Sequence, residues 1–337
     1  MRAFSFKESR AVPEAEQILR VEDLTVSFTT ETGRVRVVEN VSFTVERGRT
    51  VGLVGESGCG KSVTAMSIMR LLPSPPSHVE GGRVFFNGTD LLSLSDAEMR
   101  RIRGNRIGMI FQEPMTSLNP VYSVGFQIAE VLRLHRGLRQ DEARERVVEL
   151  LEMVGVGAAK SRLDQYPHQL SGGLRQRVMI AMALACGPSL LIADEPTTAL
   201  DVTIQAQILD LLLQLQKELE MSILMITHDL GVVAGFCDDV VVMYAGKMVE
   251  KAATEELFLR PMHPYTKGLL ASIPKIGNKS AHLPTIPGVV PSPDQRPKGC
   301  YFVDRCERAQ DSCSRETPPF VDCGDGHLLA CWNPYEQ

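Results

Sequence analysis

The sequence has no long apolar segment, few aromatic residues and no excess of positive charge. Its longest obvious apolar run, residues 178–186, is shorter than the roughly 18 residues needed to span a membrane. Residues 1–17 are polar, without the apolar core of a secretory signal. The net charge of −5 argues against a nucleic-acid partner, and the arginine-rich stretch 100–106 predicts a solvated face. We expect a cytoplasmic protein that reaches a membrane only through partners.

Residues 55–62 have the form G-x-x-x-x-G-K-S between a strand pattern at 50–54 and a helical pattern at 63–69. This context is typical of a phosphate-binding loop, whose glycines and following helix direct N–H groups at an anion. We expect Lys61 to reach the β- and γ-phosphates and Ser62 to bind Mg²⁺. The predicted nucleotide contacts are Gly55, Ser57, Gly58, Cys59, Gly60, Lys61, Ser62 and Val63.

The flanking patterns predict strands across residues 18–54, including 35–38 and 41–45, with a turn at Arg47-Gly48. Phe28 is predicted to end the first strand, where it either stacks on a nucleotide base or joins the core. Further strands are predicted at 83–87 and 107–111, the latter leading to Gln112. Helical patterns at about 123–136 and 140–154 predict an insert of helices between strands.

A second anion-binding helix start is predicted at residues 170–177. Ser171 is a good N-cap residue, and Gly172 and Gly173 leave backbone N–H groups accessible. Because one triphosphate rarely needs two such sites, we infer that this one serves a nucleotide held by another subunit.

Two further predicted strands end in polar residues. The apolar run 190–195 ends in Asp194 and Glu195, which suit Mg²⁺ coordination through water and general-base activation of water, respectively. The run 222–227 is followed by His228, which is either structural or a hydrogen-bonding sensor of the γ-phosphate; the set of motifs favours the sensor.

Together these motifs resemble the ATP-binding-cassette ATPases over about residues 18–260. The resemblance rests on 55–62, Gln112, 170–174, 190–195, Ala199-Leu200-Asp201 and His228, which follow the family's order. It implies an α/β P-loop NTPase fold with a helical subdomain at about 113–187. It also implies a head-to-tail dimer with two ATP molecules, each between one chain's phosphate loop and the other's signature. Leu174 stands at a variable signature position and Thr198 where serine is common, and neither changes the expected catalysis.

The resemblance also implies residue roles. Catalysis is expected from Glu195, His228 and Gln112, and Mg²⁺ contacts from Ser62, Gln112 and Asp194. The remaining expected nucleotide contacts are Phe28, Ser171, Gly172, Gly173 and Asp201.

A narrower resemblance, to the oligopeptide/dipeptide importer ATPases, rests on residues 196–203, 263–266 and 299–306. That subfamily also serves nickel and glutathione importers. It implies ATP-driven peptide uptake by a complex with two permease subunits, a second ATPase subunit and an extracytoplasmic solute-binding protein. The chain is then expected as a peripheral subunit on the cytoplasmic side of the inner membrane.

The C-terminal part is predicted to be a Pro-rich linker (261–299) followed by a Cys-rich extension (300–337). Prolines 284, 287, 291, 293 and 297 favour an extended linker. Five of the eight cysteines lie from residue 300 onward, which in a cytosolic protein points to metal more than to disulfides. Four of them could hold Zn²⁺ or a [4Fe–4S] cluster, or could simply pack. Paired C-x₂-C knuckles of a zinc site are missing, and the importer resemblance implies the iron–sulfur cluster on Cys300, Cys306, Cys313 and Cys331, with Cys323 free.

Two other classes of function remain open to the sequence. A soluble cassette ATPase of DNA repair would need a long coiled coil between residues 62 and 171, and no sustained heptads occur there. A translation ATPase usually carries two cassettes, and a second motif set is not found. The other class is a redox-regulated binding module centred on the cysteines. The presence of Glu195 and His228, which suit ATP hydrolysis, argues against it.

Overall fold

The computed structural model describes residues 16–31, 33–198, 200–273 and 285–336. The predictions for residues 1–15, Ala199 and Pro284 lie outside this part of the chain. The described residues form two compact units. The first contains residues up to Glu46, Thr50–Leu92 and the chain from Thr227 onward, and the second contains Arg47–Arg49 and Ser93–Ile226.

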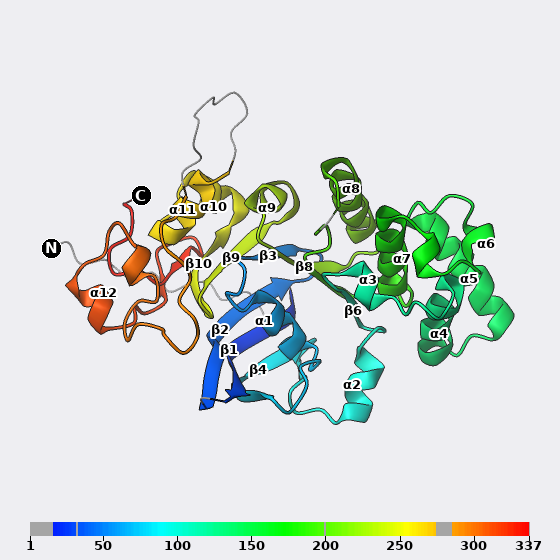
Figure 1. Cartoon of the computed structure of the whole chain (residues 1–337), viewed down its shortest axis with the longest axis horizontal. Helices are drawn as coiled ribbons and strands as arrows, with labels where there is room; N and C mark the ends of the chain where they lie inside the picture. Colours follow the sequence, from blue (N-terminus) through cyan, green and yellow to red (C-terminus); the bar gives the residue numbers. More distant parts are fainter. Residues whose placement is uncertain (1–15, 32, 199, 274–284, 337) are drawn as a thin grey trace. The chain divides into compact units, whose positions relative to one another are not determined.

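The first unit contains an antiparallel sheet with the strand order β2-β1-β4-β5 (Figure 1). Its strands are β1 (Gln17–Thr30), β2 (Gly33–Glu46), β4 (Ser77–Phe86) and β5 (Thr89–Asp90). Val41, Phe43 and Val45 alternate inward along β2, as expected for a sheet with one buried face. The two strands predicted at 35–38 and 41–45 are one strand, because Asn40, at φ 50°, changes the backbone locally without ending the pairing.

A second set of strands in this unit has the order β11-β12-β10-β9-β3. The strand β3 (Thr50–Val54) is wholly buried and pairs in parallel with β9 (Asp239–Tyr244). Next come β10 (Lys247–Ala253), β12 (Leu328–Leu329) and β11 (Val321–Asp322), all antiparallel. The C-terminal extension therefore pairs with the sheet instead of standing apart from it, because β12 forms antiparallel backbone hydrogen bonds with β10.

The helices of the first unit are short. They are α1 (Lys61–Ile68), α9 (Leu230–Phe236), α10 (Thr254–Leu259), α11 (Pro264–Ala271) and α12 (Asp311–Arg315), with a 3₁₀ turn at Val303–Arg305. Helix α11 lies where an extended Pro-rich linker was predicted. The reason is local: Pro264 occupies the first helical turn, and the His263 side chain caps the amide N–H of Tyr265.

The second unit has the parallel strand order β8-β7-β6. The strands are β6 (Ile107–Ile110), β7 (Leu190–Asp194) and β8 (Ser222–Thr227), and all their residues are buried. The strand predicted at 222–227 is confirmed, whereas β6 and β7 each end one residue before the predicted limit.

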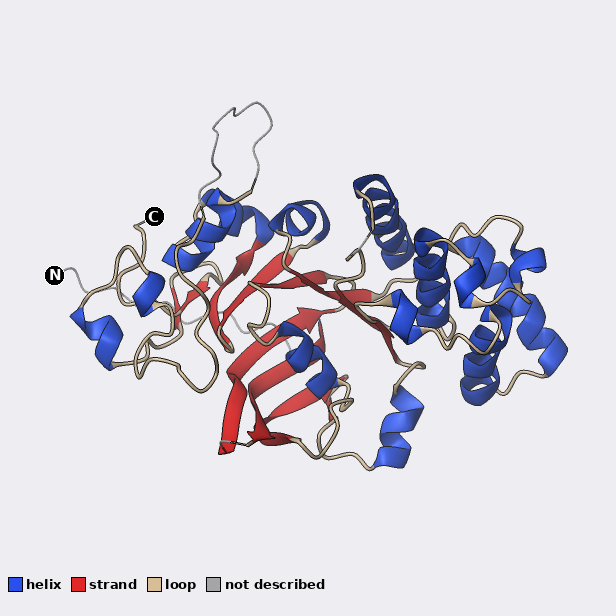
Figure 2. Ribbon diagram, in the orientation of Figure 1, coloured by secondary structure: helices blue, strands red, loops and turns tan. Residues whose placement is uncertain are grey.

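The other regular elements of this unit are helices. They are α2 (Asp96–Ile102), α3 (Pro114–Ser117), α4 (Val124–Arg136), α5 (Gln140–Met153), α6 (Ala159–Arg162), α7 (Gly172–Leu184) and α8 (Val202–Glu218), with a 3₁₀ turn at Pro167–Gln169. Helices α4, α5 and α7 pack against one another (Figure 2). Val124, Ile128 and Leu132 recur at helical spacing on the buried face of α4. The predicted helices at 123–136 and 140–154 are thereby confirmed.

No helix in the described part of the chain has the length and apolar character needed to cross a membrane.

Candidate functional site

The predicted phosphate-binding loop connects β3 to α1. Gly58 and Gly60 adopt φ angles of +78° and +103°, which are strained for other residues, and Gly60 is the N-cap residue of α1. A Cβ atom at Gly55 would lie 2.2 Å from the carbonyl oxygen of Met243. The glycines of the motif therefore let the backbone turn tightly before α1.

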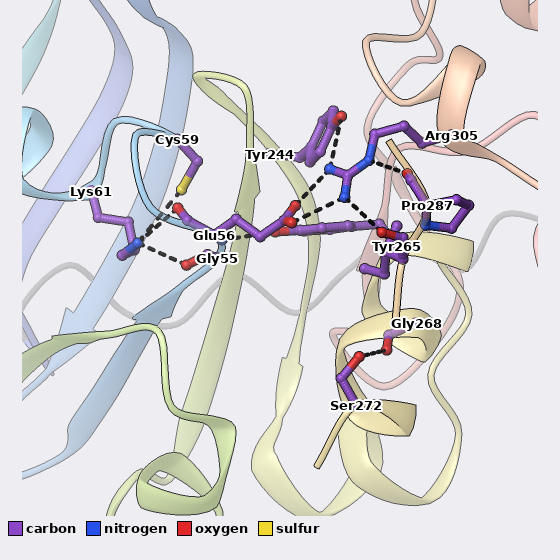
Figure 3. A network of polar contacts seen from close by, with 11 residues as sticks. Gly55, Glu56, Cys59, Lys61, Tyr244, Tyr265, Gly268, Ser272, Pro287 and Arg305 are labelled. Carbon is purple, nitrogen blue, oxygen red and sulfur yellow. Dashed lines mark hydrogen bonds and ion pairs between the residues drawn. The ribbon is translucent and has the colours of Figure 1, made fainter. Parts of the chain in front are cut away.

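Lys61 is only 5% exposed, and its ammonium group lies within the loop. Nζ donates hydrogen bonds to the carbonyl oxygens of Gly55 at 2.7 Å and Glu56 at 3.0 Å (Figure 3). Burial raises the pKa of the nearby Cys59 thiol, which therefore stays protonated at neutral pH. The backbone of the loop itself therefore holds the Lys61 ammonium group in place.

The second unit brings together Gln112 and Glu195, which are 83 residues apart. One carboxylate oxygen of Glu195 accepts hydrogen bonds from Gln112 Nε2 at 3.0 Å and from Thr198 Oγ1 at 2.8 Å. Glu195 directly follows β7 with φ at 46°, and its amide N–H donates to the carbonyl oxygen of Ile226 at 2.8 Å. The carboxylate is therefore fixed in one orientation. Asp194, at the end of β7, is 2% exposed.

The predicted second anion site is the start of α7. Ser171 is exposed and is the N-cap residue, with its hydroxyl accepting from the amide of Leu174 at 3.4 Å. A Cβ atom at Gly173 would lie 3.0 Å from the Ile204 side chain, a tight contact that favours glycine there. Asp201 caps α8 by accepting a hydrogen bond from the amide of Ile204 at 3.0 Å.

The remaining predicted residues lie in the first unit. His228 is exposed and directly follows β8. Phe28 is half-buried and is not the last residue of β1, which continues to Thr30 while Phe28 pairs with Val35 and Ser77. The hairpin with β2 extends the strand beyond the predicted limit.

Four cysteines of the extension, Cys300, Cys306, Cys313 and Cys331, line one cavity, and Cys323 is not among its lining residues. All are free thiols. Burial raises the pKa of Cys300 to about 11 and that of Cys331 to about 12, and the neighbouring cysteines add to both shifts. Within the described residues, no group of three or more His, Cys, Asp or Glu side chains could hold a single metal ion. The four donors therefore share one cavity without converging on one ion.

Sequence reasoning missed the polar residues around Glu56. The Tyr265 hydroxyl accepts from the amide of Glu56 at 2.9 Å, and Arg305 pairs with the Glu56 carboxylate (Figure 3). Tyr265 and Arg305 belong to segments that support the importer resemblance, but no local pattern indicates that either one contacts the loop.

Comparison with known proteins agrees with this geometry. Residues 38–198 match the family described as "ABC transporter", and residues 249–313 match "Oligopeptide/dipeptide transporter, C-terminal region". The chain belongs to the ATP-binding proteins of the ABC transporters, in the group that contains the peptide, dipeptide and oligopeptide transport proteins.

Individual relatives support this membership. A probable peptide ABC transporter ATP-binding protein of Sinorhizobium fredii is 51% identical over 96% of this chain and 97% of its own length. The dipeptide transport ATP-binding protein DppD of Bacillus subtilis is 51% identical over 94% of this chain and 95% of its own length.

Solved structures confirm the cassette fold. A dimeric post-hydrolysis ATP-binding cassette with bound ADP and phosphate is 28% identical with a TM-score of 0.63, covering 70% of this chain and 98% of that one. The cbiO1 subunit of a transporter complex from Clostridium perfringens is 30% identical with a TM-score of 0.61. The match covers 72% of this chain and 91% of that chain.

Proposed function

We propose that this chain is the ATP-hydrolysing subunit of a transporter that imports di- or oligopeptides. The observation that carries the proposal is the 51% identity to a dipeptide transport ATP-binding protein over 94% of this chain. The match of residues 249–313 to the oligopeptide/dipeptide C-terminal region supports the choice of peptides over nickel or glutathione.

In this proposal the phosphate loop binds ATP. The glycines and the start of α1 receive the phosphates, Lys61 contacts the β- and γ-phosphates, and Ser62 contacts Mg²⁺. Gln112 and Asp194 complete the Mg²⁺ environment, Asp194 through water. The other proposed nucleotide contacts are Phe28, Ser57, Cys59, Val63 and Asp201.

Glu195 is the proposed general base. It takes a proton from a water molecule whose oxygen attacks the γ-phosphorus, and the bond from that phosphorus to the departing ADP oxygen breaks. Support comes from the two hydrogen bonds, from Gln112 and Thr198, that orient the Glu195 carboxylate. His228 is proposed to sense the γ-phosphate by hydrogen bonding.

The proposed assembly is a head-to-tail dimer with a second ATPase subunit, bound to two permeases on the cytoplasmic side of the membrane. A solute-binding protein delivers the peptide from outside. The helices around residues 113–187 would contact the permeases, which is supported by the exposed side chains of Val121, Tyr122 and Phe126. The Tyr122 and Phe126 rings stack with centroids 4.8 Å apart, forming an apolar surface on the second unit.

Reconstitution tests the transport proposal. The chain is purified with its co-purifying permeases, identified by mass spectrometry, and the complex is placed in lipid vesicles. We expect ATP turnover to rise when a peptide-loaded binding protein is added. Stimulation by a nickel- or glutathione-loaded binding protein alone would reject peptide import, and turnover with no permease attached would favour a soluble cassette ATPase.

Ser171→Arg is expected to block turnover while the chain still binds ATP. The proposal places Ser171, Gly172 and Gly173 against a nucleotide held by the partner subunit, so a bulky cation prevents dimer closure. The measurements are ATP hydrolysis and a fluorescent-nucleotide titration. Ser95→Arg is the matched control, since Ser95 caps α2 of the same unit in the same way and its loss costs a similar capping energy, typically about 1 kcal/mol. Loss of the chain's own ATP binding in Ser171→Arg would instead place that residue at its own nucleotide.

The proposal also includes a structural [4Fe–4S] cluster held by Cys300, Cys306, Cys313 and Cys331. Support comes from the four thiols that line one cavity. Four thiolates are the usual ligand set of this cluster. When bound, the cluster would crosslink the segments of the extension that line this cavity.

Cys306→Ser is expected to abolish iron binding and to make residues from 300 onward sensitive to protease, whereas Cys323→Ser should do neither. Iron and zinc are measured by elemental analysis of anaerobically purified protein, with about four irons per chain expected from the cluster type. A content of one zinc per chain and no iron would show that the cysteines form a zinc site and not the cluster. If the protein contains neither metal and the extension still resists protease, the cysteines only contribute to packing.

A further inference from the structure

Glu56, the second residue of the phosphate loop, forms a paired ion bridge with the C-terminal extension. Arg305 Nη1 lies 2.7 Å from Glu56 Oε2, and Arg305 Nη2 lies 3.0 Å from Oε1, although the two residues are 249 positions apart (Figure 3). The Arg305 side chain is 5% exposed and that of Glu56 is 31% exposed. Such two-pronged pairs fix orientation as well as charge.

Other contacts hold Arg305 rigidly. Its Nε donates to the carbonyl oxygen of Pro287 at 2.8 Å, and Nη1 donates to the Tyr244 hydroxyl at 3.3 Å. Burial alone lowers the pKa of this guanidinium, but its hydrogen bonds to Glu56 and Tyr244 raise the pKa above the ordinary value. Arg305 therefore carries a permanent positive charge at this place.

The backbone of Glu56 is held from the same side. Its amide donates to the Tyr265 hydroxyl, and the Tyr265 ring packs against Tyr244 and Phe302 with centroids 4.7 Å and 5.3 Å away. The carbonyl oxygen of Glu56 in turn accepts a hydrogen bond from Lys61 Nζ at 3.0 Å. The extension is thus connected, through a single loop residue, to the lysine predicted to bind phosphate.

The charge of Glu56 also matters. A carboxylate in a loop that binds a triphosphate repels the ligand, and a cation paired with the carboxylate weakens this repulsion. Arg305 is the cation that the fold supplies. Removing it would leave an unpaired negative charge on the phosphate loop and release one restraint on this loop.

We propose that Arg305 is a positioning residue for ATP binding: it neutralises Glu56 and fixes the phosphate loop, so that the C-terminal extension sets the nucleotide affinity. The proposal adds a role for the extension to the ATPase activity and does not depend on whether the cysteines bind metal.

The test is a fluorescent-nucleotide titration of the full chain, with ATP turnover measured in parallel. Arg305→Ala is expected to weaken ATP binding about tenfold and to raise KM, with kcat at saturating ATP close to that of the original protein. The loss should shrink at high salt, because screening reduces charge repulsion. Adding Glu56→Gln to Arg305→Ala should restore most of the affinity, since the uncompensated charge is then gone.

Arg315→Ala is the matched control. Arg315 is an exposed residue of α12 in the same extension and pairs with Asp311, not with the loop, so its loss should leave ATP affinity unchanged. Equal weakening by Arg315→Ala, unchanged affinity in Arg305→Ala, or no recovery with Glu56→Gln would each overturn the proposal. If Arg305→Ala does not fold, as judged by thermal unfolding, Arg305→Lys decides. Lysine keeps the charge without the two-pronged geometry, so we expect a smaller loss of ATP affinity that depends on salt. An ATP affinity equal to that of the original protein would reject the role of Arg305.

Discussion

Replacing Glu195 by glutamine is expected to lower ATP turnover by roughly 10²–10⁴-fold, as for loss of a general base. The amide keeps the size of the carboxylate but cannot take a proton from the attacking water. Gln112 and Thr198 already orient this side chain, so the replacement changes chemistry more than position. ATP binding should persist, because Glu195 is not among the residues proposed to hold the phosphates. The measurements are phosphate release and nucleotide titration on the same preparation.

Glu145→Gln is a suitable control for this variant. Glu145 is an exposed residue of α5 in the same unit, so the same chemical change there should leave turnover unaltered. Turnover close to that of the original protein in Glu195→Gln would show that another group activates the water.

Replacing Lys61 by alanine is expected to weaken ATP binding by roughly 10–100-fold, the range for losing a hydrogen bond to a charged group. Lys61 is buried in the loop, and its ammonium group bonds to the carbonyl oxygens of Gly55 and Glu56. The variant removes both the charge for the phosphates and a bridge within the loop. A fluorescent-nucleotide titration measures the loss, and thermal unfolding separates it from instability.

Lys217→Ala provides the comparison, because Lys217 is an exposed residue in the last turn of α8. Unchanged affinity in Lys61→Ala would reject the phosphate-loop assignment. Comparable losses in both variants would indicate a general charge effect on the nucleotide, not a contact at the loop.

The sequence was informative wherever the controlling interactions are local. The pattern G-x-x-x-x-G-K-S requires a strand, a tight turn and a helix in immediate succession, and β3, the loop and α1 provide them. The local sequence is enough to predict Ser171 as an N-cap residue, because a capping hydrogen bond spans only three residues. Apolar runs such as 222–227 likewise predict buried parallel strands without knowledge of their neighbours.

Boundaries were less certain in the sequence because neighbouring segments decide them. β1 continues past Phe28 because β2 offers pairing partners for Thr29 and Thr30. In the segment predicted to be a linker, the local proline count suggested an extended chain, yet Pro264 begins α11 at a position where proline costs a helix nothing.

Only the tertiary structure determined which distant residues meet. Gln112 reaches Glu195 because β6 and β7 are parallel neighbours whose C-terminal ends lie at the same edge. Arg305 reaches Glu56 because β12 pairs with β10 and the aromatic rings of Tyr244, Tyr265 and Phe302 pack together. The four cysteines are spread over 300–331, and folding of the extension brings them to one cavity. Such contacts depend on the summed packing of many residues, so no short pattern in the sequence encodes them.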